Sequence, residues 1–219
     1  MIDLSKVQKR TTADIAKRIV QDIPDGAHVN LGIGQPMTIS NYLPSDKEIL
    51  LHSENGLLGM GPLAKDHEID EELVNAGKQP VTMLPGASLC HHADSFVMIR
   101  GGHIDICVLG AFQVSVKGDI ANWRTGDPKA IPAVGGAMDL ALGAKKLFVM
   151  MEHLTKSGES KLVKECTYPL TALAAVDCIY TDLATIAVTP QGLVAVDWVD
   201  RSEEHTSELQ SRLHLVCRL

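Results

Sequence analysis

The sequence has no long apolar run and no excess of basic residues. No apolar stretch in its 219 residues approaches the roughly 20 that a membrane-spanning helix requires. Lys and Arg number 20 against 27 Asp and Glu, so the formal net charge is −7 at pH 7. Because phosphate neutralisation needs clustered cations, this balance argues against a nucleic-acid surface. We therefore expect neither a membrane-spanning protein nor a nucleic-acid-binding one.

Cysteine is scarce, and the N-terminus does not look like a secretory signal. The five cysteines never occur in CxxC spacing: Cys90, Cys107, Cys166, Cys178 and Cys217. An odd and scattered set favours free thiols in a reducing compartment over a disulfide framework. The N-terminus is polar and basic and has no apolar core behind it. These features predict a cytoplasmic protein.

No internal repeat and no low-complexity linker divides the chain, so we expect one domain over residues 1–200. From about Arg201 the sequence, RSEEHTSELQSRLHLVCRL, loses the glycine usage and the strand-and-turn rhythm that precede it. We expect the segment 201–219 to be non-native or disordered. A native amphipathic terminal helix is the alternative.

The chain does contain an alternation of short apolar runs and helical stretches. Apolar runs predict strands at residues 28–32, 48–52, 81–84, 104–109, 147–151 and 178–188. Capping residues, prolines and glycines predict helices after Thr11, after Pro36, and over residues 93–100, 137–142 and 170–175. This alternation predicts an α/β fold with a mostly parallel sheet that is flanked by helices on both faces.

The strongest chemical feature is an acid that directly follows an apolar run. Residues 53–62 read SENGLLGMGP, and only His52 separates them from the apolar run Ile49-Leu50-Leu51. In parallel α/β sheets, reactive groups gather beyond the carboxyl ends of the strands. Glu54 is therefore a candidate nucleophile, and the following glycines would let a bulky substrate approach bare backbone. The alternative is an acid that only hydrogen-bonds to its own turn.

Several motifs carry a resemblance to a known family. The SENG segment with its GLLGMGP continuation resembles the B-subunit signature of the family I CoA-transferases. Further segments match this family in order: NLGIG at 30–34, NYLP at 41–44, NAGK at 75–78, RGGHID at 100–105, LGAFQV at 109–114, ANW at 121–123, GGAMDL at 135–140 and MEH at 151–153. The match extends over roughly residues 10 to 200 without a large gap. The resemblance implies the CoA-transferase (NagB/RpiA-like) architecture.

The resemblance also implies a mechanism and roles for residues. In this family the glutamate at the position of Glu54 forms a mixed anhydride with the acyl group and then a thioester with CoA. Gly136 matches the glycine whose backbone N–H stabilises the oxyanion, although a loop before a helix is the plainer reading. Lys78 matches a lysine near bound CoA, but it could be an exposed loop lysine. The further expected substrate and CoA contacts are Gly32, Gly34, Asn55, Gly59, Gly61 and Gly110, each of which could be a simple turn residue.

Other motifs in the sequence do not predict a second chemistry. The segment that begins at Gly32 lacks the third glycine of a dinucleotide fingerprint, because Met37 stands there. Gly77-Lys78 is followed by Gln79, so it is not a P-loop. Cys90-His91-His92 has no second cluster at zinc spacing, and we expect no metal. No cofactor is expected, because the CoA thioester is itself a substrate.

The resemblance further implies a partner and a substrate class. Family members combine an A subunit with a B subunit, so we expect a heteromer in which this chain pairs with a CoA-transferase A subunit. The sequence looks most similar to the 3-oxoadipate branch, which takes CoA from succinyl-CoA, and the 3-oxoacid (acetoacetate) branch is the alternative. A dicarboxylic acceptor needs a cation for its distal carboxylate, and Arg124 is the candidate. A non-catalytic module that senses an acyl-CoA or a sugar phosphate is the alternative from another class of function.

Overall fold

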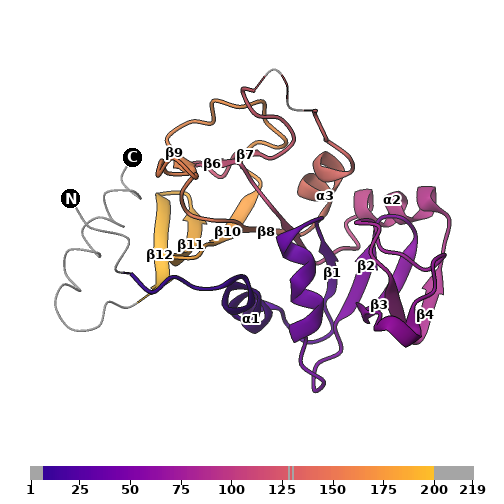
Figure 1. The fold of residues 1–219 in the computed structure, drawn as a ribbon. Helices are drawn as coiled ribbons and strands as arrows, with labels where there is room; N and C mark the ends of the chain where they lie inside the picture. The colour runs from indigo at the N-terminus through magenta and orange to yellow at the C-terminus, as the bar shows by residue number, and fades with distance from the viewer. Residues whose placement is uncertain (1–6, 128, 130, 200–219) are drawn as a thin grey trace.

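The computed structural model describes residues 7–127, 129 and 131–199 (Figure 1). The expected terminal segment 201–219 lies outside these residues. The helices are α1 (Thr12–Asp22), the 3-10 helices η2 (Gln35–Tyr42) and η3 (Asp66–Glu68), α2 (His92–Arg100) and α3 (Ala137–Gly143). The strands are β1 (His28–Leu31), β2 (Leu50–Ser53), β3 (Leu57–Leu63), β4 (Val81–Leu89), β5 (Ile106–Leu109), β6 (Gln113–Ser115), β7 (Ile120–Ala121), β8 (Lys146–Met150), β9 (Leu162–Val163), β10 (Val176–Tyr180), β11 (Ala184–Thr189) and β12 (Gly192–Trp198).

A nine-stranded sheet in the order β12-β11-β10-β8-β5-β1-β2-β3-β4 forms the centre of the molecule. The strands from β10 to β2 in this order pair in parallel. Antiparallel hairpins extend the sheet at each edge. A smaller three-stranded sheet has the order β7-β6-β9. The α/β prediction is confirmed, and the parallel arrangement that it included holds for the central strands.

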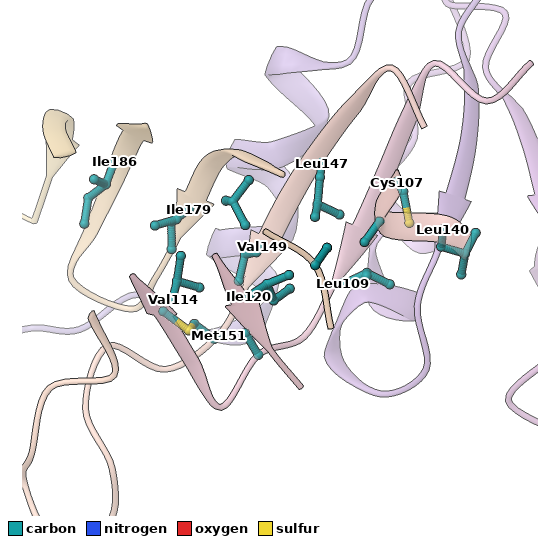
Figure 2. Packing of buried hydrophobic residues seen from close by; sticks show 14 of the residues in the cluster. Cys107, Leu109, Val114, Ile120, Leu140, Leu147, Val149, Met151, Ile179 and Ile186 are labelled. Atoms are coloured by element: carbon teal, nitrogen blue, oxygen red, sulfur yellow. The ribbon is translucent and has the colours of Figure 1, made fainter. Parts of the chain in front are cut away.

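Both faces of the central strands are buried, which explains why their sequences are almost continuously apolar. On one face, Ile106, Val108 and Phe148 pack with residues of α1. On the other face, the alternate residues Cys107 and Leu109 pack against α2, α3 and the small sheet. Figure 1 shows α1 and the small sheet on opposite sides of the large sheet, and Figure 2 shows the packing beneath the small sheet.

Helix α1 begins where the sequence predicts. The Thr11 side chain accepts a hydrogen bond from the Asp14 backbone N–H, and the Asp14 side chain accepts one from the Thr11 N–H. This capping box satisfies two backbone donors that the first turn of a helix leaves without partners. The buried residues Ile15, Ile19 and Val20 then fix which face of the helix contacts the sheet.

Two expectations about individual elements are wrong, and one strand was not expected. Residues 178–188 form a hairpin of β10 and β11, because the Thr181 hydroxyl accepts hydrogen bonds from the N–H groups of Leu183 and Ala184 and turns the chain. Residues 170–175 form a loop, because Thr171 and Ala172 donate their N–H groups to Ile120 of β7. The glycine-rich continuation after the SENG segment is a strand, β3, which pairs with both β2 and β4.

Candidate active site

The main cleft lies where the order of the parallel strands reverses. The chain passes from β1 to β2 on one side, whereas β5, β8 and β10 follow on the other side of β1. Such a switch point leaves a crevice beyond the carboxyl ends of the strands, where ligands of α/β proteins bind. A cleft of about 460 Å³ is lined by Gly32 after β1, Glu54 after β2, Gly110 after β5 and Glu152 after β8. The turn before α3, with Gly135 and Gly136, forms a further wall.

Glu54 is held by the tight hairpin turn between β2 and β3. The Gly56 N–H donates to the Ser53 carbonyl oxygen at 2.9 Å, which closes the turn around Glu54. Gly56 has φ +113°, and a Cβ there would overlap the carbonyl oxygen of Cys90, so only glycine fits. The half-buried Glu54 side chain therefore has a fixed point of attachment at the wall of the cleft.

A chain of buried polar side chains lies behind Glu54. Asn30 Nδ2 is 3.2 Å from Glu54 Oε2 and 3.1 Å from His52 Nδ1. His52 Nε2 is in turn 2.9 Å from the Ser95 hydroxyl. Asn30, His52 and Ser95 are at most 1% exposed. The acid thus contacts an ordered polar network on its protein side while its other side faces the cleft.

Burial sets the protonation of the groups in this network. Burial lowers the pKa of His52 to about 4, so its ring is neutral near pH 7. Burial also raises the pKa of the Cys107 thiol, and the nearby charge of Glu54 raises it further. A thiol that stays protonated can donate a weak hydrogen bond to Asn30 Oδ1, which is 3.8 Å from Cys107 Sγ.

Gly136 lies in the cleft wall at the start of α3. A Cβ at this position would be 2.9 Å from the Phe96 ring, so the close packing of α3 on α2 already requires a glycine. Within the described residues, the Gly136 N–H has no hydrogen-bond partner among the backbone carbonyls of the loops. The position of Gly136 is therefore compatible with both predictions from the sequence, an oxyanion donor and a loop residue before a helix.

Two other predicted glycines line the cleft, and a third lies beside it. Gly32 and Gly110 line the cleft at the ends of β1 and β5. A Cβ at Gly32 would be 2.9 Å from the Leu109 side chain and 3.0 Å from the Val108 carbonyl oxygen. Gly34 is exposed between the lining residues Ile33 and Gln35.

Gly59 and Gly61 lie away from the cleft lining, inside β3. A Cβ at Gly59 would be 2.9 Å from Ala87 Cα, and one at Gly61 would overlap the Thr82 hydroxyl. The structure thus gives both glycines a role in the close approach of β3 and β4.

The turn that carries Lys78 is attached to the segment of Glu54, although Lys78 itself does not line the cleft. The Ala76 N–H donates to the Ser53 hydroxyl at 3.0 Å, and Asn55 Nδ2 donates to the Val74 carbonyl oxygen at 2.8 Å. Lys78 is exposed and has φ +62°. Asn55 is likewise exposed and has its side-chain amide turned to this loop rather than to the cleft lining.

Arg124 is exposed and lies outside the cleft lining, whereas Lys161 lines the cleft. Among the described residues of the lining, Lys161 is the sole cation, beside the carboxylates of Glu54 and Glu152. The backbone of Lys161 is fixed on both sides, because its N–H donates to the His153 carbonyl and its carbonyl accepts from the Val114 N–H, each at 3.0 Å. Lys161 was not among the predicted site residues, because it follows a loop and carries no motif of its own.

His52 and Ser95 were also not among the predicted site residues, and Asn30 was named only as part of a motif. Asn30 and His52 are polar residues inside the apolar runs of β1 and β2. A polar side chain at a position that strand alternation buries needs a partner, and this was the available signal.

In residues 7–127, 129 and 131–199, no group of three His, Cys, Asp or Glu side chains gathers as a metal site. The same residues contain no helix with the length and apolar character needed to cross a membrane. Cys90, Cys107, Cys166 and Cys178 are free thiols.

Comparisons with known proteins show what this chain is similar to over most of its length. A family model described as Coenzyme A transferase matches residues 12–198. The chain is 64% identical over 190 residues to the B subunit of the 3-oxoadipate CoA-transferase of Pseudomonas putida, a match that covers 87% of this chain and 89% of that protein. It is 45% identical over 205 residues to the B subunit of the succinyl-CoA:3-ketoacid coenzyme A transferase of Helicobacter pylori, a match that covers 91% of this chain and 98% of that protein.

The fold is also similar to that of a solved acyl-CoA transferase apoenzyme from Escherichia coli O157:H7, with a TM-score of 0.70 at 16% identity. The similarity covers 92% of this chain, which spans 40% of that longer chain. The chain therefore belongs to the Coenzyme A transferase family, as a family I member of the B-subunit type.

Proposed function

We propose that this chain is the B subunit of a CoA-transferase that moves CoA from succinyl-CoA to 3-oxoadipate. The observation that carries the proposal is the position of Glu54, a carboxylate fixed by a tight turn at the wall of a cleft at the topological switch point. The acceptor is inferred from sequence, because identity is 64% to the chain from a 3-oxoadipate enzyme and 45% to the chain from a 3-ketoacid enzyme.

The proposed reaction uses Glu54 as a covalent carrier. Its carboxylate attacks the thioester carbonyl of succinyl-CoA, forms a mixed anhydride and releases the CoA thiolate. The thiolate then attacks the glutamyl carbonyl, which gives a Glu54–CoA thioester and free succinate. The carboxylate of 3-oxoadipate attacks this thioester, and the same two steps in reverse yield 3-oxoadipyl-CoA and the free carboxylate of Glu54.

The residues around the cleft have separate roles in this scheme. Asn30 donates to one oxygen of Glu54 and so leaves the other oxygen for attack. The N–H of Gly136 is the proposed oxyanion donor, an interaction worth about 3–4 kcal/mol where one has been removed from another enzyme. Gly32 and Gly110 leave room for the pantetheine arm. Lys78 and Asn55 lie on two connected turns that are proposed to meet the nucleotide part of CoA. Contacts of Gly34, Gly59 and Gly61 with CoA stay predictions.

Lys161, rather than Arg124, is the proposed partner of the distal carboxylate of the dicarboxylic substrates. It is the cation that lines the cleft, and its backbone is fixed by hydrogen bonds on both sides. An ammonium group in a partly enclosed cleft forms a charge-assisted hydrogen bond with a carboxylate.

The proposed assembly is a heteromer with a CoA-transferase A subunit in the cytoplasm, built on one domain over residues 1–200. The relatives from Pseudomonas putida and Helicobacter pylori are B subunits, which supports a partner chain for this protein. Free thiols suit a reducing compartment. We expect the chain alone to show no turnover, because the partner contributes further substrate contacts.

The test is to prepare the chain with its A subunit, add succinyl-CoA and analyse the Glu54 peptide by mass spectrometry. We expect a glutamyl-CoA adduct and turnover that is faster with 3-oxoadipate than with acetoacetate. Glu54→Gln should lower turnover by at least about 1000-fold, since an amide is not a nucleophile here.

Near-normal turnover of Glu54→Gln, with deamidation excluded, would contradict the mechanism. A preference for acetoacetate would favour the 3-oxoacid function instead. Binding of succinyl-CoA without any adduct would favour a sensing module.

A further inference from the structure

A buried hydrogen-bond chain connects Glu54 to helix α2, and the proposed reaction leaves most of it without a role. The chain runs from Glu54 through Asn30 and His52 to Ser95. These residues come from β1, β2, the turn after β2, and α2. Every member except Glu54 is buried, so each polar atom needs a partner of the correct type.

The surroundings of Asn30 determine how its amide is oriented. Asn30 Nδ2 is 3.2 Å from both the His52 carbonyl oxygen and Glu54 Oε2. A carbonyl oxygen and a carboxylate can only accept, so the NH₂ end of the amide must face them. The Oδ1 end then faces Cys107, whose thiol donates weakly. A flipped amide would bring Oδ1 against the charge of Glu54.

The orientation of Asn30 in turn determines the tautomer of His52. Asn30 Nδ2 is also 3.1 Å from His52 Nδ1. An N–H on Nδ1 would point at the amide hydrogens, so Nδ1 carries a lone pair and shares one of the two amide hydrogens with the His52 carbonyl oxygen. The ring proton is then on Nε2, which donates to the Ser95 hydroxyl at 2.9 Å. The Ser95 hydroxyl in turn has the Ser53 carbonyl as its acceptor, at 3.5 Å. From Asn30 through His52 and Ser95 to the Ser53 carbonyl, each group therefore donates to the next, while Asn30 also donates to Glu54.

We infer that His52 is a positioning residue for the nucleophile: its Nδ1 lone pair acts together with the His52 carbonyl oxygen to hold the Asn30 amide in the orientation that aims Glu54 at the cleft. The inference rests on the proposed function. His52 does not line the cleft, so it acts through Asn30 and not on the substrate. Its loss should leave the composition of the cleft unchanged and allow the Glu54 carboxylate to rotate. Misplacement of a reacting group by about 1 Å lowers the rate by about 100-fold.

Two substitutions of His52 separate its two ring nitrogens. The amide of His52→Asn occupies the place of Nδ1, so its oxygen can still accept from Asn30. The amide of His52→Gln reaches toward the place of Nε2, so it keeps the contact with Ser95 and loses the one with Asn30. In the complex with the A subunit, rapid quenching after mixing with succinyl-CoA measures the rate of formation of the Glu54–CoA adduct.

We expect His52→Gln to slow adduct formation by about 10- to 100-fold, with a smaller change in KM for succinyl-CoA. His52→Asn should recover most of that loss. In an Asn30→Ala background, His52→Gln should cause less than about a twofold further loss, because the two residues act as one unit. Thermal unfolding of each complex shows whether it has folded. If the His52 variants fail to assemble, Ser95→Ala, which removes the acceptor of Nε2–H, should slow the same step by several-fold.

The outcomes distinguish this inference from the function on which it rests. If the unaltered complex forms the adduct and His52→Gln forms it equally fast, the inference fails and the proposed function stands. Two other results would also contradict the inference and leave His52 with a structural role only. One is an equal loss in the rate of adduct formation from His52→Gln with and without Asn30. The other is a His52→Asn variant that forms the adduct as slowly as His52→Gln. If the unaltered complex forms no adduct, both the function and the inference are overturned.

Discussion

At the scale of single residues, the proposed chemistry depends on how the Glu54 carboxylate is held accessible at the wall of the cleft. Glu54 is half-buried, and Asn30 donates to one of its oxygens. A hydrogen bond to the charged form offsets part of the cost of removing a carboxylate from water. Partial desolvation raises the rate only where the enzyme stabilises the transition state more than the ground state. We therefore expect Asn30 to contribute to reactivity without itself reacting.

Lys161 carries a prediction at this scale. In a ping-pong reaction, kcat/KM for the acceptor reports only the half-reaction that uses the acceptor. Lys161→Gln should lower kcat/KM for 3-oxoadipate about 10- to 100-fold relative to acetoacetate, because one charge-assisted hydrogen bond to the distal carboxylate is lost. Steady-state kinetics of the complex with both acceptors measures this ratio.

Lys164→Gln is the matched control, since Lys164 is exposed nearby and does not line the cleft. We expect it to leave the ratio unchanged, and Arg124→Ala likewise. A uniform loss with both acceptors in Lys161→Gln would assign Lys161 to another part of the substrate, and a changed ratio in Arg124→Ala would restore that residue as the specificity group.

At the scale of elements, the SENGLLGMGP motif both carries the candidate acid and forms a strand of the large sheet. Glu54 lies in the hairpin turn, whereas Gly59 lies in β3, where it allows β4 to approach closely. The strand pairing of β3 holds the far end of the turn, so the packing of β3 on β4 contributes to the placement of the acid.

Gly59→Ala tests this structural role. The new Cβ would be 2.9 Å from Ala87 Cα, at a residue with φ +85°. Gly86→Ala is a matched control, because Gly86 has φ +84° and a Cβ placed there would have no atom within 4 Å. We expect Gly59→Ala to lower the free energy of unfolding by about 1–3 kcal/mol more than Gly86→Ala, since both are strained and only one is overpacked.

Urea unfolding followed by circular dichroism measures the difference between these two variants. Equal losses in the free energy of unfolding would mean that β3 and β4 can move apart at position 59 without cost. The close approach of the two strands would then not require Gly59.

Elements that depend on neighbouring residues in the sequence could be predicted correctly. The capping box at Thr11 and the apolar spacing of α1 are contained in adjacent residues, and helix α1 begins as predicted. Residues 170–175 were predicted as a helix, but the backbone N–H groups of Thr171 and Ala172 find a partner in Ile120. That partner is distant in sequence, so no local pattern could reveal the competition.

At the scale of the whole molecule, Asp105 and His52 are two of the titrating groups that connect the fold to pH. Asp105 accepts a hydrogen bond from the His28 backbone N–H and contacts Lys145, and these contacts lower its pKa from 3.8 to about 2. Burial lowers the pKa of His52 from 6.5 to about 4. Both groups join segments that are distant in sequence, so their titration reports on the folded sheet.

We expect the free energy of unfolding to fall as the pH is lowered from 6.5. The unfolded chain protonates His52 near pH 6.5 and the folded chain only near pH 4, so stability is lost across this range. Asp105 stabilises the fold above about pH 3.8, and this contribution disappears as the pH falls toward about 2. Urea titrations between pH 7 and pH 3 measure the slope.

Asp105→Asn should flatten the part of the curve below about pH 4 and leave the slope between pH 6.5 and 4 unchanged. A free energy of unfolding that is constant from pH 7 to pH 4 would contradict the burial of a neutral His52.

The sequence by itself determined the class of fold, the family and the candidate acid, because each depends on residue types at fixed local spacing. Glu54 could be selected since it directly follows an apolar strand, and the cleft lies where the strand order predicts. Only the tertiary structure decided which residues meet Glu54 and which cation lines its cleft. Asn30 contacts the acid from another strand, and Lys161 comes from beyond β8, so their positions depend on strand register and packing rather than on any neighbouring residue.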